Sequence, residues 1–372
     1  TDSVTGSSTL EPGYDTALPA TPIVYFAEAP ITHMDLSLVD LSPVPDGGTA
    51  TQAFANTVET ARQAEALGYR RFWVAEHHGR ADSIAGTTPE VLLGHLAAET
   101  DSIRLGSGAV LLNHYSPFKV AEAFGVLDAL APGRIDAGLG RANGSPAADR
   151  ALGTRRRVQN PDEDHEQKIE AVVNHLYDDY PDDHAYSDLT IPRSDGDPPV
   201  PWVLGSSPSS AAIAGELGLA YCFAAFIRPG FAAHSVEAYR DQFESSGLAG
   251  GLEEPRAMIA VNAVCGETDE EAARLRAVAE ATFARIQRGA GGRPETVQDA
   301  IDELGGVPDP TPATLDEDEW PRSISGGPAT LAGLLDQLAD RVGADEVMIQ
   351  GGAPDHDRTL RSHELLADGV GL

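Results

Sequence analysis

Short apolar runs alternate with amphipathic segments along most of the chain. Eight runs are continuously apolar or built of small residues, which is typical of strands covered on both faces. They span residues 34–43, 70–77, 103–112, 134–141, 201–207, 221–226, 256–266 and 345–351. Helical periodicity separates them, at 53–68, 88–100, 116–130, 164–178, 209–220, 234–243, 269–286, 328–343 and about 358–368. Strands that alternate with helices predict a parallel sheet.

The number of these units predicts that the sheet closes. Eight β/α units form a barrel, typically from about 250 residues upward, and the chain has 372. We therefore predict the α/β class: a single (β/α)8 TIM barrel domain over residues 31–372, with an irregular insertion at 287–325 and an irregular N-terminal arm at 1–30. A doubly wound sheet is the alternative, but no G-x-G-x-x-G motif opens a helix after the first strand.

The net charge of the chain limits the classes of macromolecule that it can bind. The chain carries 58 acidic and 26 basic residues, a formal charge of −32, and the acidic residues are spread over predicted helices and loops. Such a surface repels nucleic acid and anionic membranes, so we expect neither as a partner. Because molar salt reduces the Debye length to ~3 Å and screens self-repulsion, we interpret the charge as halophilic adaptation. Binding of cationic partners is the alternative interpretation.

The sequence carries no strong signal for membrane insertion, secretion or metal binding. No apolar stretch approaches the ~18–20 residues of a membrane helix, and the N-terminus lacks a secretory pattern, so we expect a cytoplasmic protein. The two cysteines, Cys222 and Cys265, lie in apolar runs and are interpreted as buried free thiols. They offer neither metal-ligand spacing nor a disulfide framework, so we expect no metal site.

The reactive residues of an α/β barrel lie at the C-terminal ends of its strands. Ser206, Ser207 and Ser209 stand there, where the predicted strand 201–207 meets a helix N-terminus. Hydroxyls and backbone N–H groups at a helix N-terminus form a ready phosphate site. Arg141 on the neighbouring strand could complete it with a charge-assisted pair. The alternatives are that the serines only cap the helix and that Arg141 pairs with one of the many carboxylates.

A histidine and several glycines share this rim. His77 ends the predicted strand 70–77 and titrates near neutral pH. We expect five strand-end glycines to leave room for a flat ring system: Gly106, Gly108, Gly138, Gly140 and Gly205. Phosphate anchor, flat cavity and histidine together favour a phosphorylated cofactor, and no G-x-S-x-G nucleophile elbow is present. Alternatively, His77 and His78 are an exposed pair. A metal site at 76–78 lacks the H-E-x-x-H spacing.

Three blocks of sequence resemble the bacterial-luciferase-like flavin monooxygenases, in the same order and at similar spacing. They are 72–78 with its Glu-His-His run, 103–141 and 202–219. The resemblance covers roughly 34–285 and resumes at 326–351. It implies a (β/α)8 barrel that uses reduced FMN, supplied by a separate flavin reductase, and O2 to oxygenate a small organic substrate. It also implies a homodimer.

The resemblance assigns roles to individual positions. His77 matches the catalytic histidine beside the reactive flavin ring. Gly108 and Ala109 match a non-proline cis peptide under that ring, and Arg141, Ser206 and Ser209 match the phosphate-binding positions. The other cofactor-binding positions implied are Ser107, Gly140, Leu204 and Gly205. Gly205 and Gly140 stand where the light-emitting enzymes carry a glutamate and a reactive cysteine, which argues against bioluminescence.

Two other functions stay open. Part of the family uses the deazaflavin coenzyme F-420 for hydride transfer, with His77 then the proton partner. Such enzymes often bring extra cations to a longer cofactor tail, whereas only Arg141, with Arg80 as a further candidate, stands near this site, which favours FMN. A non-catalytic flavin-binding protein is the second alternative, and retention of His77 argues against it. The insertion 287–325 resembles a variable loop that could act as a lid. Expected substrate contacts are Asn113, His114, Tyr115, Phe226 and Arg228.

Overall fold

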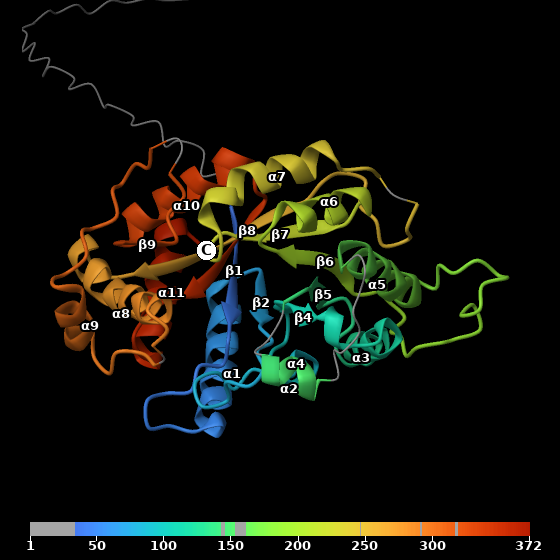
Figure 1. The fold of residues 1–372 in the computed structure, drawn as a ribbon, viewed down its shortest axis with the longest axis horizontal. Helices are drawn as coiled ribbons and strands as arrows, with labels where there is room; N and C mark the ends of the chain where they lie inside the picture. The colour runs from blue at the N-terminus through green and yellow to red at the C-terminus, as the bar shows by residue number, and fades with distance from the viewer. Residues whose placement is uncertain (1–33, 143–145, 153–160, 246, 291, 317–318) are drawn as a thin grey trace, which may run out of the picture. The chain divides into compact units, whose positions relative to one another are not determined.

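Parallel strands close into a barrel in the computed structural model (Figure 1), which describes residues 34–372 except 143–145, 153–160, 246, 291 and 317–318. Among these residues, eight strands follow one another around the barrel, and the last pairs with both β8 and β1. They are β1 (Asp35–Asp40), β2 (Arg71–Val74), β3 (Arg104–Ser107), β5 (Ile135–Gly140), β6 (Val200–Gly205), β7 (Ala220–Ala224), β8 (Ala257–Cys265) and β10 (Glu346–Gly351). The predicted (β/α)8 barrel is confirmed. The predicted arm at 1–30 lies outside the described residues.

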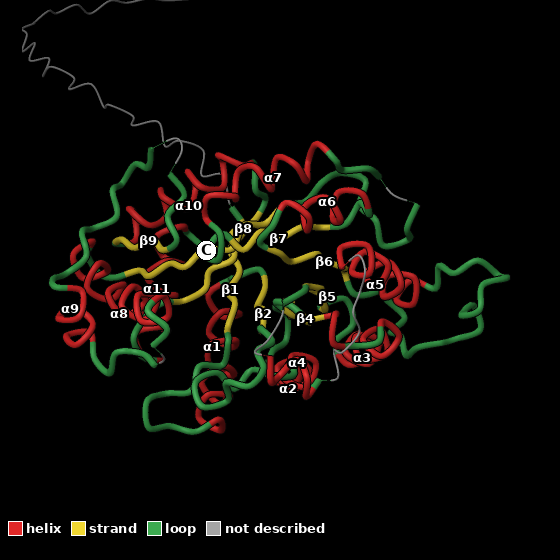
Figure 2. Tube along the Cα trace, viewed as in Figure 1, coloured by secondary structure: helices red, strands yellow, loops and turns green. Residues whose placement is uncertain are grey.

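Helices cover the outside of the barrel, as Figure 2 shows in red around the yellow strands. They are α1 (Ala50–Leu67), α2 (Pro89–Glu99), α3 (Pro117–Leu130), α4 (Pro146–Ala151), α5 (Pro161–Tyr177), α6 (Pro208–Glu216), α7 (Ala232–Asp241), α8 (Asp269–Gln287), α9 (Val297–Leu304), α10 (Pro328–Val342) and α11 (His356–Val370). Two 3-10 turns, η1 (Leu112–His114) and η2 (Pro229–Phe231), follow β4 and β7. Among the described residues, no helix is both long and apolar enough to cross a membrane.

Three sequence predictions need correction. The run 103–112 is two strands, because the backbone breaks between β3 and β4 (Val110–Leu111), which pairs with β5. Strand β2 ends at Val74 rather than at residue 77, because the chain turns so that the His77 N–H donates to the carbonyl of Gly86. The insertion 287–325 is not irregular throughout. The insertion contains α9, and the C-terminal end of the insertion runs into β9 (Ser323–Gly326), which pairs with β8.

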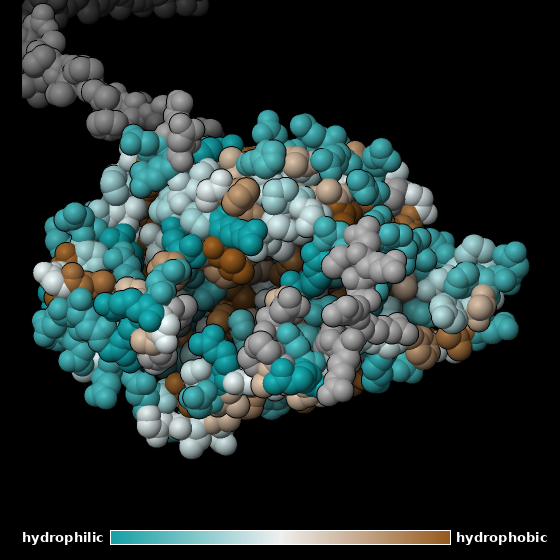
Figure 3. Space-filling model, in the orientation of Figure 1, coloured by the Kyte–Doolittle hydropathy of each residue, from teal (hydrophilic) through white to brown (hydrophobic). Residues whose placement is uncertain are grey.

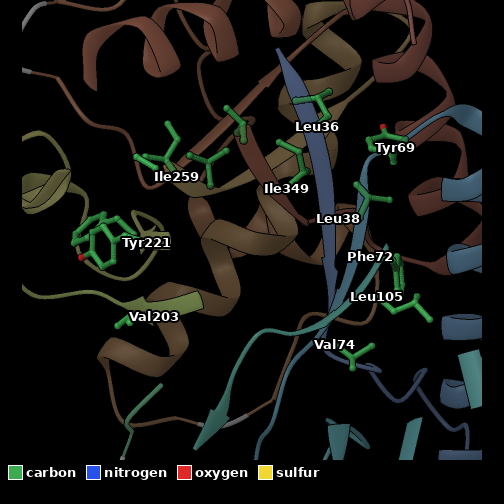
Figure 4. Packing of buried hydrophobic residues seen from close by; sticks show 14 of the residues in the cluster. Leu36, Leu38, Tyr69, Phe72, Val74, Leu105, Val203, Tyr221, Ile259 and Ile349 are labelled. Atoms are coloured by element: carbon green, nitrogen blue, oxygen red, sulfur yellow. The ribbon is translucent and has the colours of Figure 1, made fainter. Parts of the chain in front are cut away.

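Alternating strand residues build two separate cores. Outward-facing residues pack beneath the helices, among them Leu36, Leu38, Phe72, Leu105 and Ile349 (Figure 4). Inward-facing residues fill the barrel itself: Val39, Trp73, Trp202, Cys222, Met258 and Met348. This period of two is what a strand covered on both faces requires. Both cysteines are buried free thiols, as predicted.

Charged residues close the N-terminal end of the barrel. Asp136 accepts hydrogen bonds from Nε of Arg71 at 3.1 Å, from Nε of Arg104 at 2.9 Å and from the Trp202 indole at 3.2 Å. Arg71 also pairs with Glu346, which accepts from the hydroxyl of Ser37 as well. Arg71, Asp136 and Glu346 are all at least 98 % buried, so this network fills the lower end of the barrel. The opposite end is left to carry the chemistry.

Candidate active site

The strand-end glycines lie against protein rather than around an empty slot. A Cβ at Gly138 would approach the Ser107 carbonyl oxygen to 1.8 Å, and one at Gly106 would approach the Trp73 ring to 2.3 Å. At Gly205 it would meet the hydroxyl of Ser210 at 2.2 Å. At Gly106, Gly138 and Gly205 the place of a Cβ is therefore filled by barrel atoms, and these three glycines do not leave open room for a flat ligand. They let neighbouring barrel atoms approach, and a side chain at Gly205 would displace Ser210.

The Gly108–Ala109 peptide bond is cis, at the position implied by the family resemblance. The Gly108 N–H donates to the carbonyl of Val74 at 2.8 Å, which ties this bond to the end of β2. Ser107 is buried, and its hydroxyl donates to the carbonyl of Gly138 at 2.7 Å. The candidate cofactor residues Ser107, Gly108 and Ala109 thus lie between β2 and β5 at the upper end of the barrel.

His77 lies half-buried in the loop after β2. Burial, followed by the positive charge of Arg80, lowers its pKa below the ordinary histidine value, while the nearby carboxylate of Glu76 opposes the shift. The ring is therefore neutral near pH 7 and able to accept a proton. His78 is also largely buried, with 14 % of its side chain exposed. The alternative of an exposed histidine pair is therefore wrong.

The residue before His77 organises a network that the sequence analysis did not find. Glu76 has no exposed side-chain surface. It accepts hydrogen bonds from the Tyr115 hydroxyl at 2.7 Å, from Nε2 of His78 at 2.5 Å and from the backbone N–H of Leu111 at 2.9 Å. An acidic residue two positions after an apolar strand was the signal available in the sequence, but its partners lie up to 39 positions away.

The serines at the start of α6 form the candidate phosphate cradle. Ser207 is the N-cap, and its side chain accepts from the N–H of Ser210 at 3.4 Å. The hydroxyls of Ser207 and Ser209 are 3.1 Å apart, while Ser206 lies half-buried just before the cap. The capping alternative is thus correct for Ser207, yet a capped helix N-terminus still presents N–H groups and partial positive charge to an anion.

The pairing register of the strands places Arg141 beside the serines at the start of α6. Gly140 is paired with Leu204, so Arg141 and Gly205 follow at the same edge of the sheet. The Arg141 guanidinium forms an ion pair with Asp162 of α5 at 2.5 Å, and it is 31 % exposed. The alternative pairing with a carboxylate is therefore real in this structure. Because Asp162 is 52 % exposed, the pair is a weak one that a phosphate could replace.

Among the described residues, two buried polar atoms on inward-facing strand residues lack a hydrogen-bond partner. The Trp73 indole N–H and the Asn262 carbonyl oxygen make no hydrogen bond within the part of the chain that the structure describes. Asn262 follows the inward-facing Met258 and Ala260 on β8 at steps of two residues. Figure 3 shows this face hollowed near its centre, with hydrophobic surface inside the hollow. Unsatisfied buried polar groups indicate an ordered water or ligand, and a flavin ring with polar edges fits such a lining.

The predicted substrate contacts fall into two groups. Tyr115 belongs to the Glu76 network, and the Nδ2 amide of Asn113 donates to the carbonyl of Ala142 at 3.2 Å. The His114 ring lies between those of His78 and Tyr115, at about 6 Å from each, in edge-on contacts. On the other side, Phe226 packs against the inner core, whereas Arg228 is exposed in the loop after β7.

The insertion is anchored to loops at the mouth. Arg322 donates to the carbonyls of Phe226 and Ile227, in the loop that follows β7. Arg293 donates to the carbonyl of Ala353 at 2.6 Å, in the loop that follows β10. These bonds place both ends of the insertion beside the candidate site.

The C-terminal end of this α/β barrel carries His77, the buried Glu76 network and the candidate phosphate cradle at the start of α6. A family model described as luciferase-like monooxygenase matches residues 34–346. The chain therefore belongs to the luciferase-like monooxygenase family and is an oxidoreductase.

Individual relatives agree with this assignment. A luciferase-like monooxygenase of Escherichia coli is 36 % identical over 333 residues, which cover 89 % of this chain and 96 % of that protein. An N-acetyl-S-alkylcysteine monooxygenase of Bacillus subtilis is 47 % identical over 194 residues, or 52 % of this chain and 57 % of that one. The crystal structure of apo-MsnO8 is 38 % identical with a TM-score of 0.80, covering 91 % of this chain and 99 % of that one.

More distant structures share the fold alone. They include a diketocamphane monooxygenase component of Pseudomonas putida in complex with FMN, at 21 % identity and a TM-score of 0.66. An F-420-dependent secondary alcohol dehydrogenase has 13 % identity and a TM-score of 0.62. In each case the match covers 91 % of this chain and at least 98 % of the other. One of these proteins is in complex with FMN and the other is named as F-420-dependent, so the shared fold does not distinguish the two cofactors.

Proposed function

We propose that this enzyme is an FMN-dependent monooxygenase that receives reduced FMN from a separate reductase and transfers one oxygen atom of O2 to a small organic substrate. One observation carries the proposal: the α6 N-terminus, Arg141 and the neutral imidazole of His77 belong to the same end of one barrel. Such a constellation anchors a phosphate and offers a proton acceptor above a largely apolar interior.

The phosphate would be held at the start of α6. The N–H groups of that first turn and the hydroxyls of Ser206 and Ser209 would donate to its oxygens, and Arg141 would exchange Asp162 for the phosphate. The isoalloxazine ring would lie toward Gly108–Ala109 and Leu204. When bound, the flavin supplies the electrons that activate O2. The inward-facing side chains at the mouth, among them Leu204, exclude water from that reaction.

His77 would handle the proton of the reaction. Its lowered pKa leaves the ring neutral near pH 7 and able to accept a proton from a reacting group. The carboxylate of Glu76 is adjacent and stabilises the imidazolium that then forms. Retention of a titratable group here favours an enzyme over a non-catalytic flavin-binding protein.

A deazaflavin-dependent dehydrogenase is the alternative for the same site. In that case His77 would be the proton partner of a hydride transfer without O2. FMN is favoured because Arg141 and Arg80 are the cations that the sequence places near the site, and a longer anionic tail would call for more.

Cofactor titration separates these functions. The protein is purified in about molar KCl and titrated with FMN, reduced FMN and coenzyme F-420, following fluorescence. We expect FMN in either redox state to bind, Arg141→Ala to weaken binding about tenfold, and His77→Ala to leave it unchanged. Binding of the deazaflavin alone would establish the dehydrogenase. Failure of all three to bind would refute the proposal.

The substrate search has a natural starting point. Because one relative is an N-acetyl-S-alkylcysteine monooxygenase, thioethers of acylated amino acids form the first panel, with ketones and terpenes as comparison. Substrate-dependent O2 consumption above the rate without substrate identifies a match.

We also propose a homodimer that forms through α2 and α3. Three large apolar side chains are exposed on these neighbouring helices: Val91 at 73 %, Leu130 at 64 % and Val126 at 46 %. Exposed apolar side chains on neighbouring helices favour association. Light scattering is expected to give a dimer that Leu130→Glu dissociates, while Leu304→Glu on α9 leaves it intact. A monomeric parent protein would refute this.

The acidic surface supports the proposal of halophilic adaptation. With a formal charge of −32, self-repulsion grows as salt is removed. We expect the melting temperature to fall steadily as KCl is lowered from molar to 0.1 M. Equal melting temperatures across that range would favour the alternative of cationic partners.

A further inference from the structure

The carboxylate of Glu76 contacts three groups, one in its own loop after β2 and two in the segment 111–115. One oxygen, Oε1, accepts from the Tyr115 hydroxyl and from Nε2 of His78, and the other, Oε2, accepts from the N–H of Leu111. With the carboxylate as acceptor, the close contact to His78 uses the tautomer that carries its proton on Nε2. The protein supplies three donors to a carboxylate that can accept about four, and the side chain has no exposed surface through which it could contact a substrate.

These bonds hold His77 from both sides. Glu76 and His78 are its two chain neighbours, and both belong to the network. Leu111 comes two residues after Ala109, so the same carboxylate ties the His77 loop to the segment that contains the Gly108–Ala109 bond. The relative placement of the histidine and the proposed flavin surface therefore depends on one side chain.

The same carboxylate also acts on His77 through its charge. The groups that influence the imidazole are Glu76, whose negative charge favours the protonated ring, and Arg80 and His78, which disfavour it. Glu90 of α2 and His114 of η1 interact with the Glu76 and His78 pair from the neighbouring elements. Among these, Glu76 is the group that opposes desolvation of His77.

We propose that Glu76 is a positioning residue: its buried carboxylate sets both the place of His77 over the flavin surface and the charge that His77 experiences. This inference rests on the proposed function for its catalytic consequence, but its two physical parts can be measured without turnover. The bond from Glu76 to the segment that contains Gly108–Ala109 predicts an effect on cofactor affinity, and the charge of Glu76 predicts an effect on the titration of His77.

The first measurement is the NMR titration of the His77 ring in cofactor-free protein, with the resonance assigned by its loss in His77→Ala. In Glu76→Gln the side chain keeps its size but loses its charge, so we expect the titration to move to lower pH. Tyr115→Phe removes one hydrogen bond and keeps the charge, so the midpoint is expected to stay. Glu76→Asp also keeps the charge, and its midpoint is expected closer to that of the parent than to that of Glu76→Gln.

The second measurement is reduced-FMN affinity. Loss of a buried hydrogen bond to a charged group is expected to raise the Kd about tenfold in Glu76→Gln and in Glu76→Asp, whose shorter side chain cannot reach all three donors. If Glu76→Gln does not fold, Glu76→Asp decides, because the proposal requires weaker binding with a nearly unchanged titration.

Glu76 is only structural, and the proposal fails, if these variants melt at lower temperature while the His77 titration and FMN affinity stay at parental values. The two proposals fail separately. If the parent protein binds no FMN, the proposed function is refuted, whereas the titration in cofactor-free protein still shows whether Glu76 governs His77.

Discussion

The two ends of this barrel use buried charge in opposite ways. At the N-terminal end, Arg71, Asp136 and Glu346 are almost completely buried, and they pair with one another. At the C-terminal end, Glu76 is equally buried but its partners are neutral or titratable, and the neighbouring His77 is half-buried. One end is a closed ionic plug, and the other is an open rim with groups whose protonation can change.

This difference shows how one scaffold separates stability from chemistry. Removing one partner of a fully hydrogen-bonded buried ion pair strongly lowers the stability of the fold, because the other charge stays buried without a partner. A rim that must exchange ligands and protons instead keeps its ion pairs exposed, as in Arg141 and Asp162. Substitutions at the two ends should therefore have different readouts.

The largest effect on folding is expected at the plug. Asp136→Ala leaves Arg71 buried without one of its carboxylate partners and removes an acceptor for Trp202. We expect a loss of about 3–5 kcal/mol in the free energy of unfolding, measured by denaturant titration in molar KCl. A loss below about 1 kcal/mol would show that the network does not stabilise the barrel.

The corresponding change at the rim should affect turnover and not stability. His77→Ala removes the proposed proton acceptor, for which a rate loss of about 100- to 10,000-fold is expected. The unfolding free energy should change by less than about 1 kcal/mol, since the ring is half-buried and outside both cores. A variant with near-parental turnover would remove His77 from the mechanism.

Lowering the pH should reduce the free energy of unfolding through the buried histidine His363. Burial, with a contribution from His356, lowers the pKa of His363 to about 4. A histidine free in the unfolded chain titrates near 6.5, so the unfolded state binds the extra proton first and stability is lost as pH falls from about 6.5 to 4. The loss approaches about 3 kcal/mol for this residue.

The matched variant for that test is His363→Phe, which keeps a ring next to Tyr69 but cannot titrate. Burial also lowers the pKa of His165 to about 4, so the slope of unfolding free energy against pH should become smaller but not vanish. An unchanged slope would mean that His363 is not responsible.

The smallest expected effect is at the α6 cap. Ser207→Ala should cost about 1 kcal/mol of stability and weaken FMN binding severalfold, because the first turn of α6 loses its cap. Thr296→Ala removes the capping box of α9 and should cost a similar amount of stability. If both variants weaken FMN binding equally, the α6 terminus has no special role.

The periodicity of the chain was sufficient to predict the barrel, because its eight strands are buried on both faces and read as continuous apolar runs. It failed for β9, whose Ser-Ile-Ser-Gly sequence is short and polar and is held in the sheet by Asn262 to Cys265 of β8. It also missed α9, although Thr296 and Asp299 form a capping box that was visible in the sequence.

The site was harder to predict because the pairing register of the strands determines which side chains of neighbouring strands come into contact. The position of His77 followed from strand order and family resemblance. The Trp73 ring fills the space beside Gly106, and the Ser107 carbonyl fills the space beside Gly138. Only the folded barrel brings those atoms to these positions. The link between Glu76 and Tyr115 arises in the same way, from a turn after β2 that meets the chain after β4.

The most direct test of the account is the reaction of bound reduced FMN with O2, followed by stopped-flow absorbance in molar KCl. We predict that the parent protein alters the course of flavin reoxidation relative to free reduced FMN, and that His77→Ala, which still binds, returns it toward that of the free flavin. Reoxidation indistinguishable from that of free flavin in both proteins, with hydride transfer to coenzyme F-420 instead, would contradict the monooxygenase assignment of this site.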